Sequence, residues 1–281
     1  MSKPIVVVGV DGSDAATDAL RWAIDCAEAH GGTVRAVSAW NVPTFGGPMA
    51  EPTAPVAGPD LAQAAADAIE HSLSQLDRVP ASLERVVVHG DPVALLEQMG
   101  AEPDVVMVVV GRRGLGRLAT VLLGSTSRAL IHGAPCPVAV VPRGKHDHGG
   151  PTLVGVDGSP GALAALRWAD RWGGPHIIAV HAWRVHYFHN VPMLPRSEFA
   201  EMAQARLEKT QREFEAGPPA HATQIDYRLT EGDARSMLVS RHASMLVVGK
   251  CHGLPARMVG SVAAAVTVRS SIPVIVTPPT E

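Results

Sequence analysis

Cysteine is scarce in this sequence: its 281 residues include three, Cys26, Cys136 and Cys251, and no pair has CxxC spacing. A secreted disulfide framework needs a denser and even-numbered set, so we expect a reducing compartment. Long apolar runs are also missing, since none reaches the roughly 20 residues that cross a bilayer. Residues 1–4 lead directly into a predicted strand, without the apolar core of a signal peptide. We therefore expect a cytoplasmic protein without a membrane span.

An excess of positive charge is absent as well, because 24 Lys and Arg stand against 27 Asp and Glu, for a formal net charge of −3. This balance gives no support to binding of nucleic acid or of an anionic membrane surface. Aromatic residues make up only 4% of the chain. A sequence poor in aromatics and rich in Val and Ala is typical of a parallel sheet of Val-rich strands under Ala-rich helices.

The first half alternates apolar strands with amphipathic helices. Residues 5–10 form a continuous apolar run, which is typical of a strand buried on both faces. The sequence predicts strands at 5–10, 33–40, 85–89, 104–110 and 137–141, and helices at 15–30, 60–78, 92–100 and 125–132. This alternation predicts an α/β fold, a doubly wound parallel sheet with helices on both faces.

The second half repeats the first in the same order. Val10-Asp11-Gly12-Ser13 recurs as Val156-Asp157-Gly158-Ser159, Leu20-Arg21-Trp22-Ala23 as Leu166-Arg167-Trp168-Ala169, Ala39-Trp40 as Ala182-Trp183, Gly90-Asp91 as Gly232-Asp233, Val109-Val110-Gly111 as Val247-Val248-Gly249, and Gly124-Ser125 as Gly260-Ser261. An ordered match of this length predicts tandem duplication of a whole five-stranded domain. We expect one domain over 1–143, a linker at 144–150 and a second domain over 151–281.

Residues 108–126 combine the features of a phosphate site. An apolar strand ends at Gly111, a basic loop containing Arg112-Arg113 and Gly114 follows, and Gly124-Ser125-Thr126 begins the next helix. Glycines let backbone N–H groups approach a phosphate, and a helix N-terminus adds partial positive charge. Arginine side chains add full charge and forked donors. Taken alone, the glycines are explained equally well as turn and helix-packing residues.

The ends of two predicted strands are expected to share one crevice. Asp11 follows the first strand, and Gly111 ends the fourth. Ligands of doubly wound sheets bind beyond the carboxyl ends of the strands, where the strand order reverses. If the first and fourth strands are neighbours, Asp11 and the phosphate loop face each other there.

The same residues fit a family pattern. Gly111, Arg112-Arg113, Gly114, nine further residues and Gly124-Ser125 match G-x2-G-x9-G-[S/T] without a gap. With Val10-Asp11-Gly12-Ser13 and the closing run 136–141, the chain resembles a tandem universal stress protein of the bacterial ATP-binding type, once in each half.

The resemblance implies strand order 3-2-1-4-5 in each domain, and ATP as the ligand, with Mg²⁺ or Mn²⁺ as an optional companion of its phosphates. It implies that Asp11 lies by the ribose and adenine and that Ala39 presents its backbone to the adenine edge. The nucleotide site expected in the first domain consists of Gly9, Val10, Asp11, Ala39, Val110, Gly111, Arg112, Arg113, Gly114, Gly124, Ser125 and Thr126.

The second loop departs from the pattern. Gly249 and Gly260 are 11 positions apart (260 − 249), whereas Gly111 and Gly124 are 13 apart (124 − 111), and Pro255 removes an N–H donor. We expect asymmetric binding, with the first domain taking ATP and the second taking it weakly or not at all. Any site in the second domain would use Asp157, Gly249, Gly253, Gly260 and Ser261.

Three functions compete at this point: a nucleotide-binding stress-response regulator, a slow ATPase or nucleotidyl transferase, and a scaffold that works without nucleotide. Phosphoryl transfer needs a positioned base and metal carboxylates besides a cationic clamp. The sequence shows the clamp but no obvious base and no metal-ligand cluster, so we favour the regulator and expect no fast turnover. Its protein partners are unknown.

The last strand of each domain, 137–141 and 273–277, is rich in Val and Ile. An unpaired apolar edge invites association, so we expect the two last strands to pair antiparallel and to join the domains as an intrachain pseudo-dimer. Two chains could associate further as a homodimer.

In the second domain, a long loop carries Tyr187 and Phe188, with His181, His186 and His189 around it. These histidines leave a pH-dependent or metal-binding role open. We favour a loop that packs its aromatics over the crevice of the second domain.

Overall fold

The computed structural model describes residues 3–41, 58–112, 123–146, 149–189, 191–217, 223–239, 242–250 and 260–279. Its first half alternates strands and helices as predicted. The elements are β1 (Ile5–Gly9), α1 (Asp14–Ala29), β2 (Thr33–Trp40), α2 (Gly58–Ser74), β3 (Glu84–His89), α3 (Pro92–Gly100), β4 (Val105–Gly111), α4 (Ser125–Gly133) and β5 (Val138–Val141). None of the described helices of the chain is long and apolar enough to cross a membrane.

The second half repeats this order and adds a short hairpin. Its elements are β6 (Thr152–Gly155), α5 (Pro160–Trp172), β7 (His176–Trp183), β8 (Tyr187–Phe188), β9 (Val191–Pro192), α6 (Arg196–Glu215), β10 (Gln224–Glu231), α7 (Ala234–Val239), β11 (Met245–Gly249), α8 (Ser261–Arg269) and β12 (Val274–Thr277). Strands β8 and β9 pair antiparallel outside the main sheet, and the sequence did not predict them.

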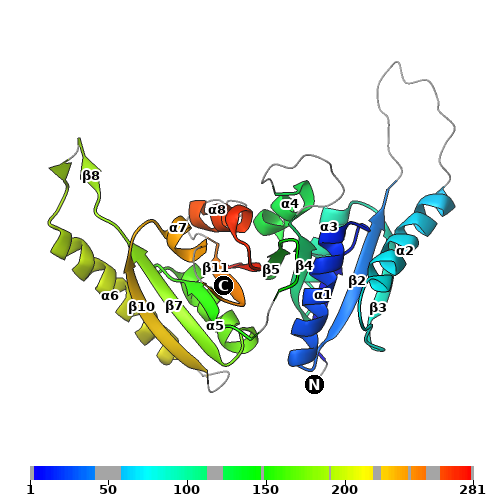
Figure 1. Cartoon of the computed structure of the whole chain (residues 1–281), viewed down its shortest axis with the longest axis horizontal. Helices are drawn as coiled ribbons and strands as arrows, with labels where there is room; N and C mark the ends of the chain where they lie inside the picture. The colour runs from blue at the N-terminus through cyan, green and yellow to red at the C-terminus, as the bar shows by residue number, and fades with distance from the viewer. Residues whose placement is uncertain are drawn as a thin grey trace, which may run out of the picture.

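One ten-stranded sheet runs through both halves in the order β10-β7-β6-β11-β12-β5-β4-β1-β2-β3 (Figure 1). Read within each half, this is the expected order 3-2-1-4-5. Strands β5 and β12 pair antiparallel at the centre, with Val140 opposite Val274 and Val138 opposite Val276. The predicted junction between the last strands is confirmed, and it buries both apolar edges completely.

Side-chain caps fix where the helices begin. Ser13 Oγ accepts from the N–H of Ala16, and Ser159 Oγ accepts from that of Ala162, each at 3.2 Å. A serine oxygen at this position satisfies one of the N–H groups that the first helical turn leaves without a partner. The duplicated Asp-Gly-Ser sequence therefore starts α1 and α5 at the same point of each sheet.

The core thiols make stability depend on pH. Burial, reinforced by the charge of Asp25, raises the pKa of Cys26 from 9.0 to about 12. Above pH 9.0 the unfolded chain releases this proton and the folded chain keeps it, so the free energy of unfolding falls as pH rises. We expect the free energy of unfolding to fall with pH more steeply in the wild type than in Cys26→Ala, by up to about 1.4 kcal/mol per pH unit. Urea unfolding between pH 8 and 10.5 measures the difference, and equal slopes would contradict the buried, protonated thiol.

Candidate functional site

A crevice opens where β1 and β4 lie side by side, beyond their carboxyl ends. Its volume is about 430 Å³, within the range of small-molecule sites. The described residues that line it are Gly9, Val10, Asp11, Ser13, Ala16, Val37, Ala39, Pro92, Leu96, Val110, Gly111, Gly124, Ser125, Thr126 and Ser127. We call this cavity the first crevice.

The first crevice brings together most of the residues predicted from sequence. Those that line it are Gly9, Val10, Asp11, Ala39, Val110, Gly111, Gly124, Ser125 and Thr126. Arg113 and Gly114 lie outside the described residues. Sequence reasoning missed Pro92 and Leu96, although their spacing of four places them on one face of α3.

The N-terminus of α4 faces this crevice. Gly124 is its N-cap residue, with φ −61° and ψ 155°, and has no side chain to cap the helix. The first N–H groups of a helix have no partner within it, so those of α4 are donors for an anion. The Gly124 N–H donates to the carbonyl of Arg112 at 2.9 Å, which ties together the two ends of the loop between them.

Asp11 begins the turn at the other side of the crevice. Its Oδ1 accepts from the N–H of Ser13 at 3.1 Å and from Ser13 Oγ at 2.6 Å. These bonds hold the carboxylate beside the N-terminus of α1. Among the described residues that line the first crevice, Asp11 carries the one ionisable side chain.

Gly111 is also required for packing. A Cβ there would lie 2.7 Å from the backbone carbonyl carbon and oxygen of Ala15, so β4 and α1 touch at this point. Gly249 meets Gly161 in the same way in the second half. The alternative explanation of Gly111 as a packing residue is therefore supported, and Gly111 also lines the first crevice.

The Arg112 side chain lies elsewhere than predicted. It does not line the first crevice; its Nη1 donates to the carbonyls of Ser270 at 2.6 Å and Val268 at 3.3 Å, at the C-terminus of α8. Burial lowers the pKa of Arg112. A guanidinium donates to the carbonyls that a helix end leaves unpaired, and its positive charge interacts favourably with the negative end of the helix dipole.

Lys250 makes the matching contact in the opposite direction. It follows β11 as Arg112 follows β4, and its Nζ donates to the carbonyls of Ala134 at 2.9 Å and His132 at 3.3 Å, at the C-terminus of α4. Each half thus caps a helix of the other, and we call these two contacts the reciprocal caps. Burial lowers the pKa of Lys250, an effect that Cys136 and Glu97 oppose.

The second half has a smaller crevice at the equivalent place, about 250 Å³ in volume. Of the residues expected at a site in the second domain, Asp157, Gly249, Gly260 and Ser261 line this cavity, together with Lys250, whereas Gly253 lies outside the described residues. We call this cavity the second crevice, and it is smaller than the first crevice of about 430 Å³.

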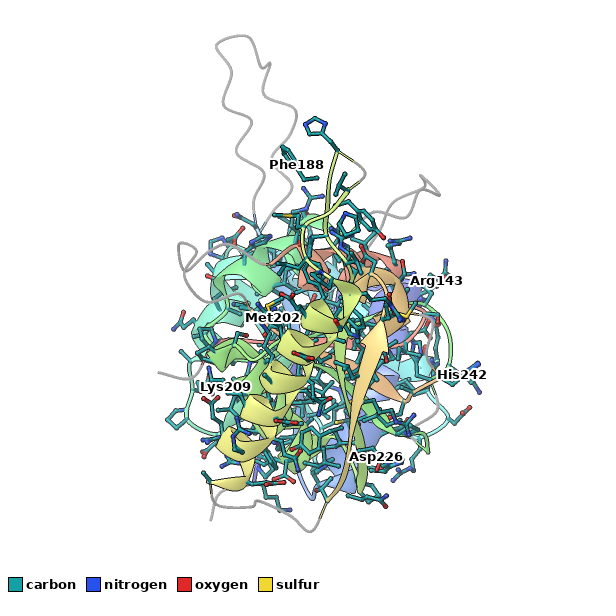
Figure 2. The ribbon with its side chains drawn as sticks, turned by 90° about the vertical axis from the view of Figure 1, so that its left-hand side faces the viewer. Arg143, Phe188, Met202, Lys209, Asp226 and His242 are labelled. Carbon is teal, nitrogen blue, oxygen red and sulfur yellow. The ribbon has the colours of Figure 1, made fainter. Side chains whose placement is uncertain are left out.

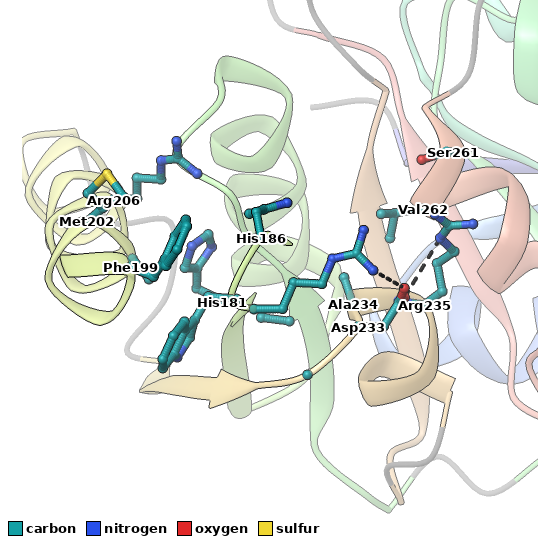
Figure 3. A pocket seen from close by; sticks show the side chains of 15 residues that line it. His181, His186, Phe199, Met202, Arg206, Asp233, Ala234, Arg235, Ser261 and Val262 are labelled. Atoms are coloured by element: carbon teal, nitrogen blue, oxygen red, sulfur yellow. Dashed lines mark hydrogen bonds and ion pairs between the residues drawn. The ribbon is translucent and has the colours of Figure 1, made fainter. Parts of the chain in front are cut away.

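A third cavity, which the sequence did not predict, adjoins the second crevice (Figure 3). It has a volume of about 330 Å³. We call it the arginine cavity, and its lining residues include His181, Trp183, Arg184, His186, Phe199, Met202, Arg206, Asp233, Arg235, Ser261 and Val262.

The aromatic loop near this cavity does not pack as expected. Tyr187 and Phe188 are 62% and 67% exposed, and Figure 2 shows Phe188 projecting away from the body of the protein. The expectation that these rings cover the second crevice was wrong, because β8 and β9 form a hairpin of their own that carries them outward. His186, at the base of this hairpin, lines the arginine cavity.

Comparison with known proteins gives a consistent result over both halves. The model of the universal stress protein family matches residues 3–142 and again residues 150–278. Two proteins of Mycobacterium tuberculosis named universal stress proteins are similar in sequence. One is 34% identical over 213 residues, covering 69% of this chain and 68% of that protein. The other is 30% identical over 292 residues, covering 96% of this chain and 95% of that protein.

The likeness in fold also extends over the whole chain. The crystal structure of a universal stress protein from Archaeoglobus fulgidus superposes with a TM-score of 0.62 at 18% sequence identity. The superposition covers 100% of both chains.

Proposed function

The chain belongs to the universal stress protein family, and on that premise we propose that it is a nucleotide-binding regulator of the stress response, with its ATP site in the first crevice. The observation that carries the proposal is the juxtaposition of Asp11 and the uncapped N-terminus of α4 across one cavity of about 430 Å³. A carboxylate accepts from sugar hydroxyls, and a helix N-terminus binds phosphate. The crevice therefore offers a carboxylate to the sugar end of a nucleotide and helix N–H donors to its phosphate end.

In this arrangement the adenine and ribose lie toward β1 and β2, and the phosphates lie toward α4. Asp11 contacts the ribose, and the backbone at Ala39 borders the adenine edge. Gly111, Ser125 and Thr126 border the phosphates. The apolar side chains of Val37 and Leu96, which also line the crevice, exclude water from the base.

The described residues that line the first crevice favour binding of ATP over its turnover. Phosphoryl transfer needs a base or a water-positioning group together with metal carboxylates, and Asp11 is the one carboxylate among the described lining residues. No cluster of three or more metal-binding side chains occurs in the described part of the chain. A Mg²⁺ or Mn²⁺ ion at this site would be held chiefly by phosphate oxygens, with the hydroxyls of Ser125 and Thr126 nearby.

Three further features belong to the same proposal. The boundary between the domains lies in the linker 144–150, and the protein works in the cytoplasm, as its sparse cysteines suggest. A homodimer of whole chains must use another surface than β5 and β12, because these strands already pair with each other.

Equilibrium dialysis with labelled ATP tests the site. We expect saturation at about one nucleotide per chain, because the second crevice is smaller and its loop is shortened. Native mass spectrometry of the purified protein should show the same stoichiometry. Two equal tight sites per chain would overturn the asymmetry, and no saturable binding would overturn the proposed function.

A further inference from the structure

The arginine cavity gathers positive charge from separate elements of the second half. Arg184 follows β7, Arg206 lies on α6 and Arg235 lies on α7, and all three line the same cavity. Among the described residues that line it, Asp233 is the one carboxylate. The lining therefore has a net positive charge even with its histidines neutral.

Asp233 positions two of these arginines without cancelling their charge. Its Oδ2 lies 3.4 Å from Arg184 Nη1, and its Oδ1 lies 3.7 Å from Arg235 Nε. One carboxylate at these distances leaves most guanidinium donors available. Figure 3 shows Arg206 across the cavity from Arg235, with His186 between them. Arg206 makes no ion pair within the described part of the chain, so its charge is also uncompensated.

An apolar wall and two imidazoles complete the cavity. Phe199 and Met202 extend from α6, and the Phe199 ring lies 5.6 Å from the ring of His186, centroid to centroid. His181 is buried, and its Nδ1 donates to the Val156 carbonyl at 2.7 Å, which fixes the orientation of its ring in the wall of the cavity. A bound molecule would therefore meet both charged donors and a flat apolar surface.

The repeat shows that this chemistry belongs to the second half. When Ala39-Trp40 is aligned with Ala182-Trp183, His181 and Arg184 stand where the first half has Ser38 and Asn41. When Gly90-Asp91 is aligned with Gly232-Asp233, Arg235 stands where the first half has Val93. The cations are additions to a shared framework, so they are not required by the fold.

We propose that the arginine cavity binds a small organic molecule that carries two or more phosphate or carboxylate groups and an apolar body, at a site separate from the ATP site. Guanidinium groups present forked donors that match both kinds of anion. Their placement at opposite ends of the cavity selects a ligand with more than one anionic group. A volume of about 330 Å³ suits such a molecule.

Anion titrations of the full chain, followed by NMR of the histidine rings, test this site. The probes are pyrophosphate and citrate, which separate phosphate from carboxylate recognition, and the His186 signals are assigned by their loss in His186→Gln. We expect a saturable shift of the His186 signals with at least one probe. Arg206→Gln should weaken the apparent affinity by about 10-fold or more, because a charge-assisted bond is lost.

Two controls make the result specific. Arg212→Gln removes an exposed arginine of the same helix, one that pairs with Glu208, and should change the affinity less than about 2-fold. Gly124→Asp, which puts a carboxylate at the first crevice, should leave the His186 response intact, so this test stands apart from that of the ATP site. The proposal is overturned by the absence of a shift at millimolar anion, by equal effects of the two arginine variants, or by loss of the response in Gly124→Asp.

Discussion

Gly124→Asp should weaken ATP binding severely while leaving the protein at least as stable as the wild type. Gly124 has the extended backbone of an N-cap residue, and Asp is a better N-cap than Gly by a few tenths of a kcal/mol. The new carboxylate would accept from the free N–H groups of α4 and occupy the position proposed for phosphate. Like charges in contact cost several kcal/mol, so we expect affinity to fall by at least about 100-fold.

Gly260→Asp is the matched control for this experiment. Gly260 is the N-cap of α8 with φ −59° and ψ 153°, and it too lacks a side-chain cap. The same substitution there should stabilise α8 equally and leave ATP affinity unchanged. Calorimetric titration measures the affinity, and thermal unfolding measures the stability. Equal loss of binding in both variants would show that the ATP site does not lie chiefly in the first crevice.

Lys250→Met should destabilise the whole protein by about 1.5–3 kcal/mol, the usual contribution of hydrogen bonds to a charged group. Lys250 is buried, and its Nζ donates to the carbonyls of His132 and Ala134. Methionine has a similar shape but no donor, so the C-terminus of α4 would lose its cap from the other half. Urea unfolding of the full chain measures this change.

Two further variants identify the cause of that loss. Lys250→Arg keeps a donor and copies Arg112, so it should retain most of the stability. Arg143→Met removes a cation whose pair with Asp14 is exposed, and such pairs contribute about 0–1 kcal/mol. If Lys250→Met were no worse than Arg143→Met, the cap from Lys250 would contribute no more to stability than an exposed ion pair does.

The fold was predictable because local and global signals agree. Apolar strands alternate with helices, Asp91 and Pro92 mark the start of α3, and the repeat shows that both halves share one topology. The two last strands were predicted to pair because their apolar edges need burial. The hairpin of β8 and β9 was missed, since its two-residue strands carry no periodic signal.

The site was predictable only where backbone position determines it. Asp11 and Gly111 follow from the strand order, and both line the first crevice. The side chain of Arg112 could not be placed, because its partners at Val268 and Ser270 are more than 150 residues away in sequence. The arginine cavity was missed for the same reason, since Arg184, Arg206 and Arg235 come from separate elements.

The reciprocal caps have a consequence for assembly. In a symmetric dimer of identical subunits, the same patch must complement itself, so a residue that contacts the partner cannot change on one side alone. Here the two sides of the contact belong to one chain, and one cap is Arg112 whereas the other is Lys250. Covalent linkage also makes the pairing independent of protein concentration. The halves can therefore evolve toward different ligands without dissolving the interface that holds them together.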